Sequence, residues 1–185
     1  GYWKDVGTLG SYWEANMELI DIIPEFNLYE EYWKIYTKSD AVPPQYVSAE
    51  SKIEKSLITG GAEIYGDVYN SVIGAGVTIG KGTVVRDSII MKNTTIGENC
   101  TIDKAIIAEE VEISDGVVMG IGEEVPNKVQ PKIYSFGLVT IGENSYIPPN
   151  VKIGKNTAIA GDTTPDDYNE GVLASGETLI KVGER

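Results

Sequence analysis

Apolar residues recur in short blocks from Ile53 onward, separated by polar and glycine-rich positions. Four segments align with one another: IEKSLI, VYNSVI, VRDSII and IDKAII. The last two intervals between them are both seventeen residues long, and each divides into one block of five residues and two blocks of six. In a six-residue block, the first residue and a small or β-branched residue four positions later can both point inward from a short strand. The pattern therefore predicts parallel strands stacked into a prism with three faces per turn.

Every block has to turn a corner before the next block begins. The residue before the second inward position is glycine or asparagine in nearly every block, and Glu110 is the clear exception. Glycine and asparagine tolerate left-handed backbone angles, which cost other residues about 1–2 kcal/mol. The pattern predicts left-handed corners at Gly76, Gly82, Asn93, Asn99, Gly116, Asn144, Asn150 and Asn156.

Two regions depart from the repeat. Residues 119–140 contain two prolines and a charged stretch, so we expect a loop that leaves the rod there before the repeat resumes at Ile141. The tail after Gly161 is acidic, and its VLASGETLIKV segment predicts a hairpin around Ser175 and Gly176. Such a hairpin would form a capping tail over the last coil.

The stretch before the rod, TLGSYWEANMELIDIIP, predicts a helix. Ser11 and Glu14 fit a capping box, apolar residues at helical spacing share one face, and Pro24 ends the pattern. A connector with a Pro-Pro pair follows. We therefore divide the chain into an N-terminal unit at residues 1–45 and a β-helix domain at residues 46–185.

Composition excludes several kinds of chemistry. The chain has no histidine, which rules out histidine general bases, Ser-His-Asp triads and His-ligated zinc. Acidic residues number 28 against 15 basic ones, a formal charge of −13, so we expect no nucleic-acid and no membrane partner. No apolar run approaches the roughly 18 residues of a membrane helix. The single cysteine, Cys100, falls at an inward block position, and we expect a buried thiol in a cytoplasmic protein.

The repeat resembles the left-handed parallel β-helix family, and the expected handedness comes from that resemblance. The opening stretch GYWKDVGT, with SYWEANMELID and the later IYTKSDAVPPQYVS, resembles bacterial glucose-1-phosphate adenylyltransferases. In that family these segments run from the end of the nucleotidyltransferase domain into the hexapeptide rod. The predicted fold class is therefore mainly β: a left-handed parallel β-helix preceded by a short helix and linker from a truncated α/β nucleotidyltransferase domain.

This resemblance implies transfer of an adenylyl group from ATP to glucose 1-phosphate in glycogen biosynthesis, with release of pyrophosphate. It implies that Asp5 is a carboxylate ligand of the catalytic Mg²⁺ and that Trp3 lies against the sugar phosphate. The family's glycine-rich nucleotide loop, second metal-binding aspartate and sugar-binding lysine have no counterpart in this sequence, so we expect the chain alone to be inactive, with no metal bound. The resemblance also implies supports for the turn that carries Asp5, namely Tyr2, Val6, Gly7 and Thr8.

The implied role of the rod is subunit assembly, as a homotetramer, and an allosteric response to an anionic metabolite. Plant relatives carry an effector-binding lysine where this chain has Gly142, so the resemblance does not name the effector. Phosphate-bearing effectors are held by charge-assisted hydrogen bonds, and the candidate residues that border the loop or the resumed repeat are Lys128, Lys132, Lys152 and Lys155.

Two other readings stay open. One is another sugar-phosphate nucleotidyltransferase, of the mannose-1-phosphate guanylyltransferase type. The other is a noncatalytic regulatory or scaffold subunit that uses the rod for assembly alone. Asp5 favours a catalytic parent, because a scaffold has no need for a carboxylate at that position.

Overall fold

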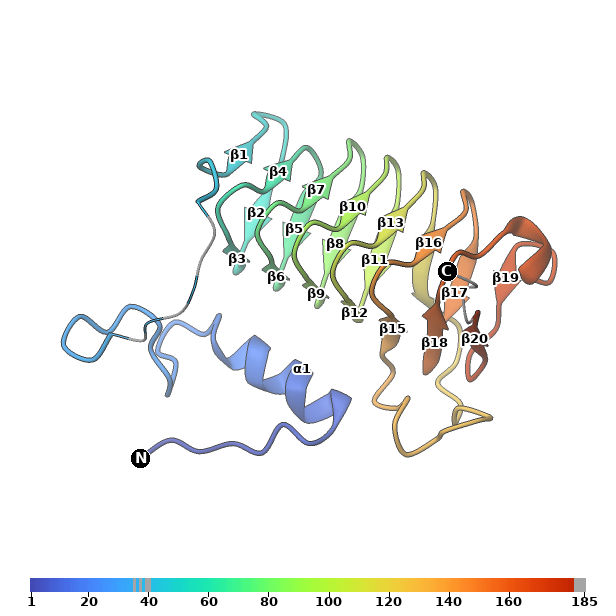
Figure 1. Ribbon diagram of the computed structural model, residues 1–185, viewed down its shortest axis with the longest axis horizontal. Coiled ribbons are helices and arrows are strands. Elements are labelled where there is room, and N and C mark those ends of the chain that lie inside the picture. Colours follow the sequence, from blue (N-terminus) through green and yellow to red (C-terminus); the bar gives the residue numbers. More distant parts are fainter. Residues whose placement is uncertain (35, 37, 39–40, 182–185) are drawn as a thin grey trace.

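Three parallel sheets form the faces of a rod in the computed structural model, which describes residues 1–34, 36, 38 and 41–181 (Figure 1). Sheet A consists, in spatial order, of β1 (Tyr46–Val47), β4 (Glu63–Ile64), β7 (Thr78–Ile79), β10 (Thr95–Ile96), β13 (Glu112–Ile113) and β16 (Tyr146–Ile147). Sheet B consists of β2 (Ile53–Glu54), β5 (Asp67–Tyr69), β8 (Val84–Arg86), β11 (Thr101–Asp103), β14 (Val118–Ile121), β17 (Lys152–Gly154) and β19 (Val172–Leu173). Sheet C consists of β3 (Leu57–Ile58), β6 (Val72–Ile73), β9 (Ile89–Ile90), β12 (Ala105–Ile107), β15 (Val139–Ile141), β18 (Thr157–Ala160) and β20 (Thr178–Ile180).

Inward side chains stack on their equivalents in the next coil. In sheet A the register pairs isoleucine with isoleucine along the rod, and each of these side chains is almost completely buried. Full burial of such a side chain contributes about 1.5–3 kcal/mol. The repeat therefore forms a continuous apolar core, and the predicted mainly-β, left-handed parallel β-helix is confirmed. The sheet A ladder consists of Ile64, Ile79, Ile96, Ile113 and Ile147.

The predicted left-handed corners are confirmed. All eight predicted positions have positive φ, and Glu110, the exception in the pattern, has a φ of 57° as well. At Gly82 the space beside the α-carbon is also filled: an added β-carbon would lie 2.4 Å from Oδ1 of Asn99 in the next coil. Glycine in one coil thus makes room for the asparagine that stacks on it.

The corner between sheets B and C has no glycine in the first four coils, and there it was missed by the sequence analysis. Four residues there have φ between 44° and 50°. Serine hydroxyls beside this corner connect successive coils: Ser71 N–H donates to Oγ of Ser56, and Ser88 N–H donates to Oγ of Ser71. The corner residues are of mixed types, so a search for Gly or Asn does not find this corner. The serine side chains that connect the coils there lie one position further along the chain. The corner residues are Lys55, Asn70, Asp87 and Lys104.

The end of the rod contains a further coil. The hairpin predicted around Ser175 and Gly176 is wrong, because β19 pairs in parallel with β17 and β20 pairs in parallel with β18. Gly176 has a φ of 79° and turns a corner of the coil, as glycine does elsewhere in the rod. Leu173 and Leu179 continue the inner ladders. The turn signal was real, but the apolar register decided which strands pair. A short 3-10 helix, η1 (Pro165–Asp167), precedes this coil.

Between β14 and β15 the chain leaves the rod and descends toward the helix (Figure 1). Two buried asparagines hold this excursion. Asn127 donates through Nδ2 to the carbonyl of Asn156, 2.9 Å away, and accepts the N–H of Gln130 at 2.8 Å. Asn156 accepts the N–H of Gly137 at 2.7 Å. Backbone groups that no strand can pair are thus satisfied by side chains.

The helix α1 (Leu9–Glu18) begins at a different residue from the one predicted. Thr8 is the N-cap: its Oγ1 accepts the N–H of Ser11, and Oγ of Ser11 accepts the N–H of Thr8, both at 3.1 Å. The predicted box of Ser11 and Glu14 is therefore wrong. Thr8 has the extended backbone that an N-cap requires, whereas Ser11 is already helical. The helix ends at Glu18, well before Pro24.

One face of α1 packs on the outer face of sheet C. Met17 and Ile20 join a second hydrophobic cluster with outward residues of the sheet. Trp13 donates its indole N–H to the backbone carbonyl of Asp87 at 2.7 Å. Phe136 of the excursion lies against Gly10, where an added β-carbon would approach its ring to 3.2 Å. The sheet C residues in this cluster are Leu57, Val72, Ile89 and Ile106, and Met91 directly follows β9.

Candidate functional site

Residues 1–8, the opening strip, run beside α1 in the opposite direction to the helix (Figure 1). The hydroxyl of Tyr2 donates to Oε2 of Glu18 at 2.9 Å. The ammonium of Lys4 forms an ion pair with Oε1 of the same carboxylate, and it lies 3.7 Å from Oε2 of Glu14. The strip then enters the helix through the Thr8 cap. Three of its eight residues are thus tied to α1.

These contacts shift the titration of all three groups that meet at the end of the helix. Hydrogen bonds from Lys4 and then from Tyr2 lower the pKa of the Glu18 carboxyl. The same carboxylate raises the pKa of Lys4 and the pKa of Tyr2, chiefly through the hydrogen bonds they donate to it. The charged form of Glu18 is therefore the one that holds the strip.

Asp5, the predicted metal ligand, lies exposed in the middle of the strip. Its Oδ1 accepts the N–H of Gly7 at 2.9 Å, which closes a tight local turn. Trp3, the predicted sugar-phosphate contact, has 83% of its side chain exposed. Both residues therefore stand free of the rod and of the helix core.

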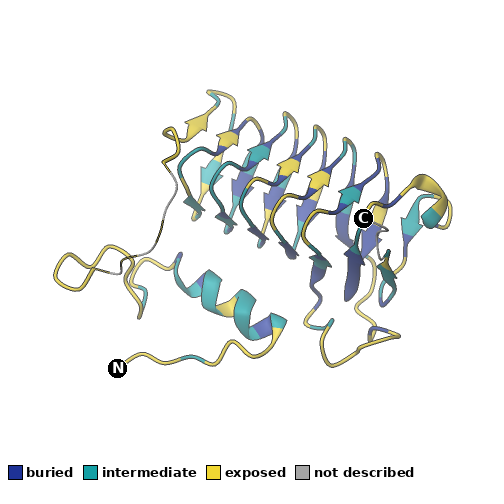
Figure 2. Ribbon diagram, in the orientation of Figure 1, coloured by how far each residue is buried: buried dark blue, intermediate teal, exposed yellow. Residues whose placement is uncertain are grey.

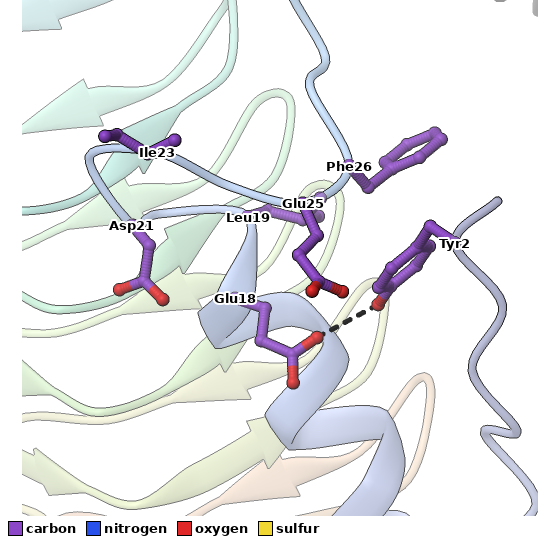
Figure 3. A pocket seen from close by; sticks show the side chains of 7 residues that line it. All are labelled: Tyr2, Glu18, Leu19, Asp21, Ile23, Glu25 and Phe26. Carbon is purple, nitrogen blue, oxygen red and sulfur yellow. Dashed lines mark hydrogen bonds between the residues drawn. The ribbon is translucent and has the colours of Figure 1, made fainter.

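A pocket of about 330 Å³ opens where the strip meets the end of α1 (Figure 3). Tyr2 and Phe26 form one wall, with ring centroids 5.9 Å apart. Carboxylates dominate the other wall, and Asp21 forms an ion pair with Lys55 of the first coil at 3.1 Å. An excess of carboxylates disfavours phosphates here. The lining residues are Tyr2, Glu18, Leu19, Asp21, Ile23, Glu25 and Phe26.

The four candidate effector lysines lie in three places. Lys132 lies in a groove with Val6, Gly7 and Thr8, next to the opening strip. Lys152 is exposed on the outer face of sheet B. The remaining two meet at one corner: Gly176 accepts the backbone N–H of Lys128 and donates its own N–H to the carbonyl of Lys155. The side chain of Lys128 forms an ion pair with Glu177.

Asp5 is suited to be one ligand of a metal ion, but the described part of the chain does not complete a site around it. Carboxylate oxygens are hard ligands of the kind Mg²⁺ prefers. Among residues 1–34, 36, 38 and 41–181, no three or more His, Cys, Asp or Glu side chains are grouped to hold a metal. Asp5 would therefore need further ligands from outside this set.

Burial at Cys100 agrees with the predicted core position. Its side chain is buried within the rod, and its Sγ lies 3.2 Å from the carbonyl of Ser114. Burial raises the pKa of this thiol. The residue is therefore part of the packing and is a poor nucleophile.

The sequence analysis missed Lys4 and Glu18. They are fourteen residues apart and lie on different elements, Lys4 in the strip and Glu18 at the end of α1, so no local pattern could have paired them. Only the antiparallel course of the strip along α1 brings them together.

Comparison with known proteins agrees with the fold and extends beyond it. Residues 43–141 match the family described as GlmU-like, C-terminal hexapeptide, and the chain belongs to this family of hexapeptide-repeat proteins. The described residues include no helix long and apolar enough to cross a membrane.

Similarity to individual proteins covers the strip, the helix and the rod together. The glucose-1-phosphate adenylyltransferase of Lachnospira eligens is 64% identical over 184 residues, which are 100% of this chain and 44% of that protein. The Thermotoga maritima protein of the same name is 52% identical over 97% of this chain and 43% of its own length. That of Acetivibrio thermocellus is 42% identical over 100% of this chain and 43% of its own length. The chain thus spans less than half of these curated relatives, in their C-terminal part.

Proposed function

We propose that the chain is the C-terminal region of a glucose-1-phosphate adenylyltransferase. The observation that carries this proposal is the 64% identity to the Lachnospira eligens protein over 184 residues, which include the opening strip and the rod. The complete enzyme would transfer an adenylyl group from ATP to glucose 1-phosphate, with release of pyrophosphate, in the cytoplasm. The rod would supply regulation and subunit assembly.

The opening strip would contribute to the active site of that enzyme. Asp5 would supply one carboxylate ligand to Mg²⁺, and Trp3 would lie against the sugar phosphate. The metal, when bound, would neutralise negative charge where two phosphates meet. The exposure of both residues supports this assignment, because neither one is used by the packing of α1 on sheet C.

Exposed apolar side chains support a role in assembly. Tyr32, Trp33 and Ile22 are each more than four-fifths exposed, although large apolar patches are rare on surfaces that stay in water. The complete enzyme would cover them with its other parts or with further subunits, and a homo-oligomer fits this.

An anionic effector would bind among Lys128, Lys132, Lys152 and Lys155. For Lys128 to take part, its ion pair with Glu177 would have to open.

The proposal is tested by comparing this chain with a chimera. In the chimera, the part of the Lachnospira eligens protein that precedes the matched region is joined to Gly1. With ATP, glucose 1-phosphate and Mg²⁺, we expect ADP-glucose from the chimera and none from the chain alone. Asp5→Asn in the chimera should lower kcat about 100-fold or more, because a metal ligand is lost. Turnover by the chain alone would contradict the proposal.

Two further outcomes would favour the alternatives. A complete enzyme, with its own nucleotide-binding part, that used GTP and mannose 1-phosphate in preference would indicate a guanylyltransferase. A folded chimera with no transfer activity, beside an active Lachnospira eligens enzyme, would indicate a noncatalytic subunit.

A further inference from the structure

The opening strip is held on α1 by some of its side chains and leaves others exposed. Tyr2 and Lys4 both reach Glu18 on α1, while Trp3 between them is exposed. Asp5 is exposed as well, and its Oδ1 accepts the N–H of Gly7 within the strip. The two residues assigned to metal and sugar phosphate are therefore next to the residues that hold the strip and are themselves exposed.

The two oxygens of Glu18 take different partners. Oε2 accepts the Tyr2 hydroxyl, the contact drawn in Figure 3, and Oε1 pairs with Lys4. A carboxylate accepts from both partners at once and carries the charge that pairs with the Lys4 ammonium. An amide at this position could accept from Lys4 through its oxygen and donate its NH₂ group to the tyrosine oxygen, but it would carry no charge. The ion pair with Lys4 is therefore the contact that requires an acidic residue.

Glu18 is itself held on the rod. It is the last residue of α1, beside the buried Met17, and the helix is bonded to the rod through Trp13 and Asp87. The strip is thus tied to a fixed element near its start, at residues 2 and 4, and again at the Thr8 cap. Asp5 lies between these ties.

We propose that Glu18 is a positioning residue, which acts through Tyr2 and Lys4 to fix the strip that carries Trp3 and Asp5. This inference rests on the proposed function of Asp5 and Trp3. Exposed ion pairs add little to folding stability, so the contribution of Glu18 falls on the orientation of the strip. Glu18 touches neither the substrate nor the metal in this role.

The test uses the catalytically competent chimera and the variant Glu18→Gln. Hydrogen exchange at residues 1–8 should rise, while exchange in α1 and in the rod strands stays unchanged. The Mg²⁺ concentration at half-maximal activity should rise, and kcat/KM should fall, by about 10-fold, at the low end of effects seen for residues that orient metal ligands. Glu18→Asp keeps both oxygens and should restore part of the loss.

Glu63→Gln is the matched control. Glu63 also accepts a tyrosine hydroxyl, that of Tyr65 at 3.0 Å, but on sheet A of the rod. This variant should change neither exchange in the strip nor the Mg²⁺ requirement.

The remaining outcomes separate this inference from the proposed function. Faster exchange in the strip with an unchanged Mg²⁺ requirement would overturn the positioning role, as would unchanged exchange. If Glu18→Gln perturbs α1, Lys4→Met and Tyr2→Phe together remove the same contacts without changing the helix, and they should reproduce both effects. An Asp5→Asn variant of the chimera that retained full activity would refute the proposed function, whatever the hydrogen-exchange data show.

Discussion

The interior of the rod and the interface between α1 and sheet C are both apolar, but they are built differently. Inside the rod, each inward side chain stacks on the apolar residue at the equivalent position of the next coil, and the sheet A ladder is nearly inaccessible to water. At the α1 interface, Met17 and Ile20 each retain 9% exposure, and Trp13 donates its indole N–H to the backbone carbonyl of Asp87. Figure 2 shows the same contrast, with buried positions on the strands and intermediate exposure along α1.

The contrast lies in how each contact is specified. A coil contacts its nearest neighbours, so one period of sequence, repeated, builds the whole core. The helix contacts outward positions of sheet C, such as Val72 and Ile106. The packing inside the coil does not require these outward positions to be apolar. Lys104 illustrates the mixed character of that interface, with its ammonium 4.4 Å from the ring centroid of Phe136. We therefore expect damage to the rod to be severe and damage to the α1 interface to be local.

The largest effect is expected for Ile96→Ala. Ile96 is fully buried between Ile79 and Ile113, and the cavity left behind cannot collapse against flanking coils. The free energy of unfolding should fall by about 2–5 kcal/mol, measured by chemical denaturation. The outward neighbour Thr95→Ala is the control and should stay within about 0.5 kcal/mol of the parent. Equal losses of unfolding free energy for Ile96→Ala and Met17→Ala would contradict the expected difference between the rod and the α1 interface.

A smaller and local effect is expected for Met17→Ala. Its side chain retains 9% exposure and lies at the edge of the rod, so the loss should be about 2 kcal/mol, at the low end of the range for core methionines. Hydrogen exchange should accelerate in α1 and the opening strip, while the strands of sheet A keep their protection. If the strands lost protection together with the helix, the two regions would unfold as one unit.

The smallest effect is expected at the end of the rod, where a polar contact closes the last coil. Asp167 accepts hydrogen bonds from Lys181 at 2.6 Å and from the N–H of Thr164 at 2.7 Å, and these bonds lower its pKa to about 2. Because the folded pKa lies below the unfolded value of about 3.9, the stabilisation is complete above that value and disappears as pH falls toward 2.

Thermal unfolding across pH tests this contact. Asp167→Asn should lower Tm by a few degrees at pH 7 and by less at each step below pH 4, relative to the parent chain. The exposed neighbour Asp166 provides the control variant Asp166→Asn, which should match the parent throughout. A difference in Tm between Asp167→Asn and the parent that did not shrink with acidification would show that the end of the rod does not depend on this charge.

Much of the rod could be predicted from local pattern. The inward isoleucines and the Gly and Asn corners report backbone geometry directly, since Gly and Asn adopt left-handed angles most readily and isoleucine fills an apolar core. The errors arose where one signal had two structural meanings. Gly176 suits a hairpin and a coil corner equally, and Ser11 resembled an N-cap although Thr8 comes first in the chain.

The candidate site also consists of a part that the sequence pointed to and a part that it did not. The resemblance of GYWKDVGT drew attention to Asp5 and Trp3, which belong to a contiguous motif. The tie from Glu18 to Tyr2 and Lys4 joins residues of two separate elements, and the bonds of Gly176 to Lys128 and Lys155 join the excursion to the last two coils. Such contacts depend on how separate elements are oriented.

The sequence by itself determined the repeated coil, because each block carries its own inward residue and its own corner and needs only the next copy for a partner. Tertiary structure alone decided where α1 docks, which carboxylate holds the opening strip and how the rod ends. These depend on the outer face of sheet C and on the antiparallel course of the strip, and both exist only after the coils have stacked.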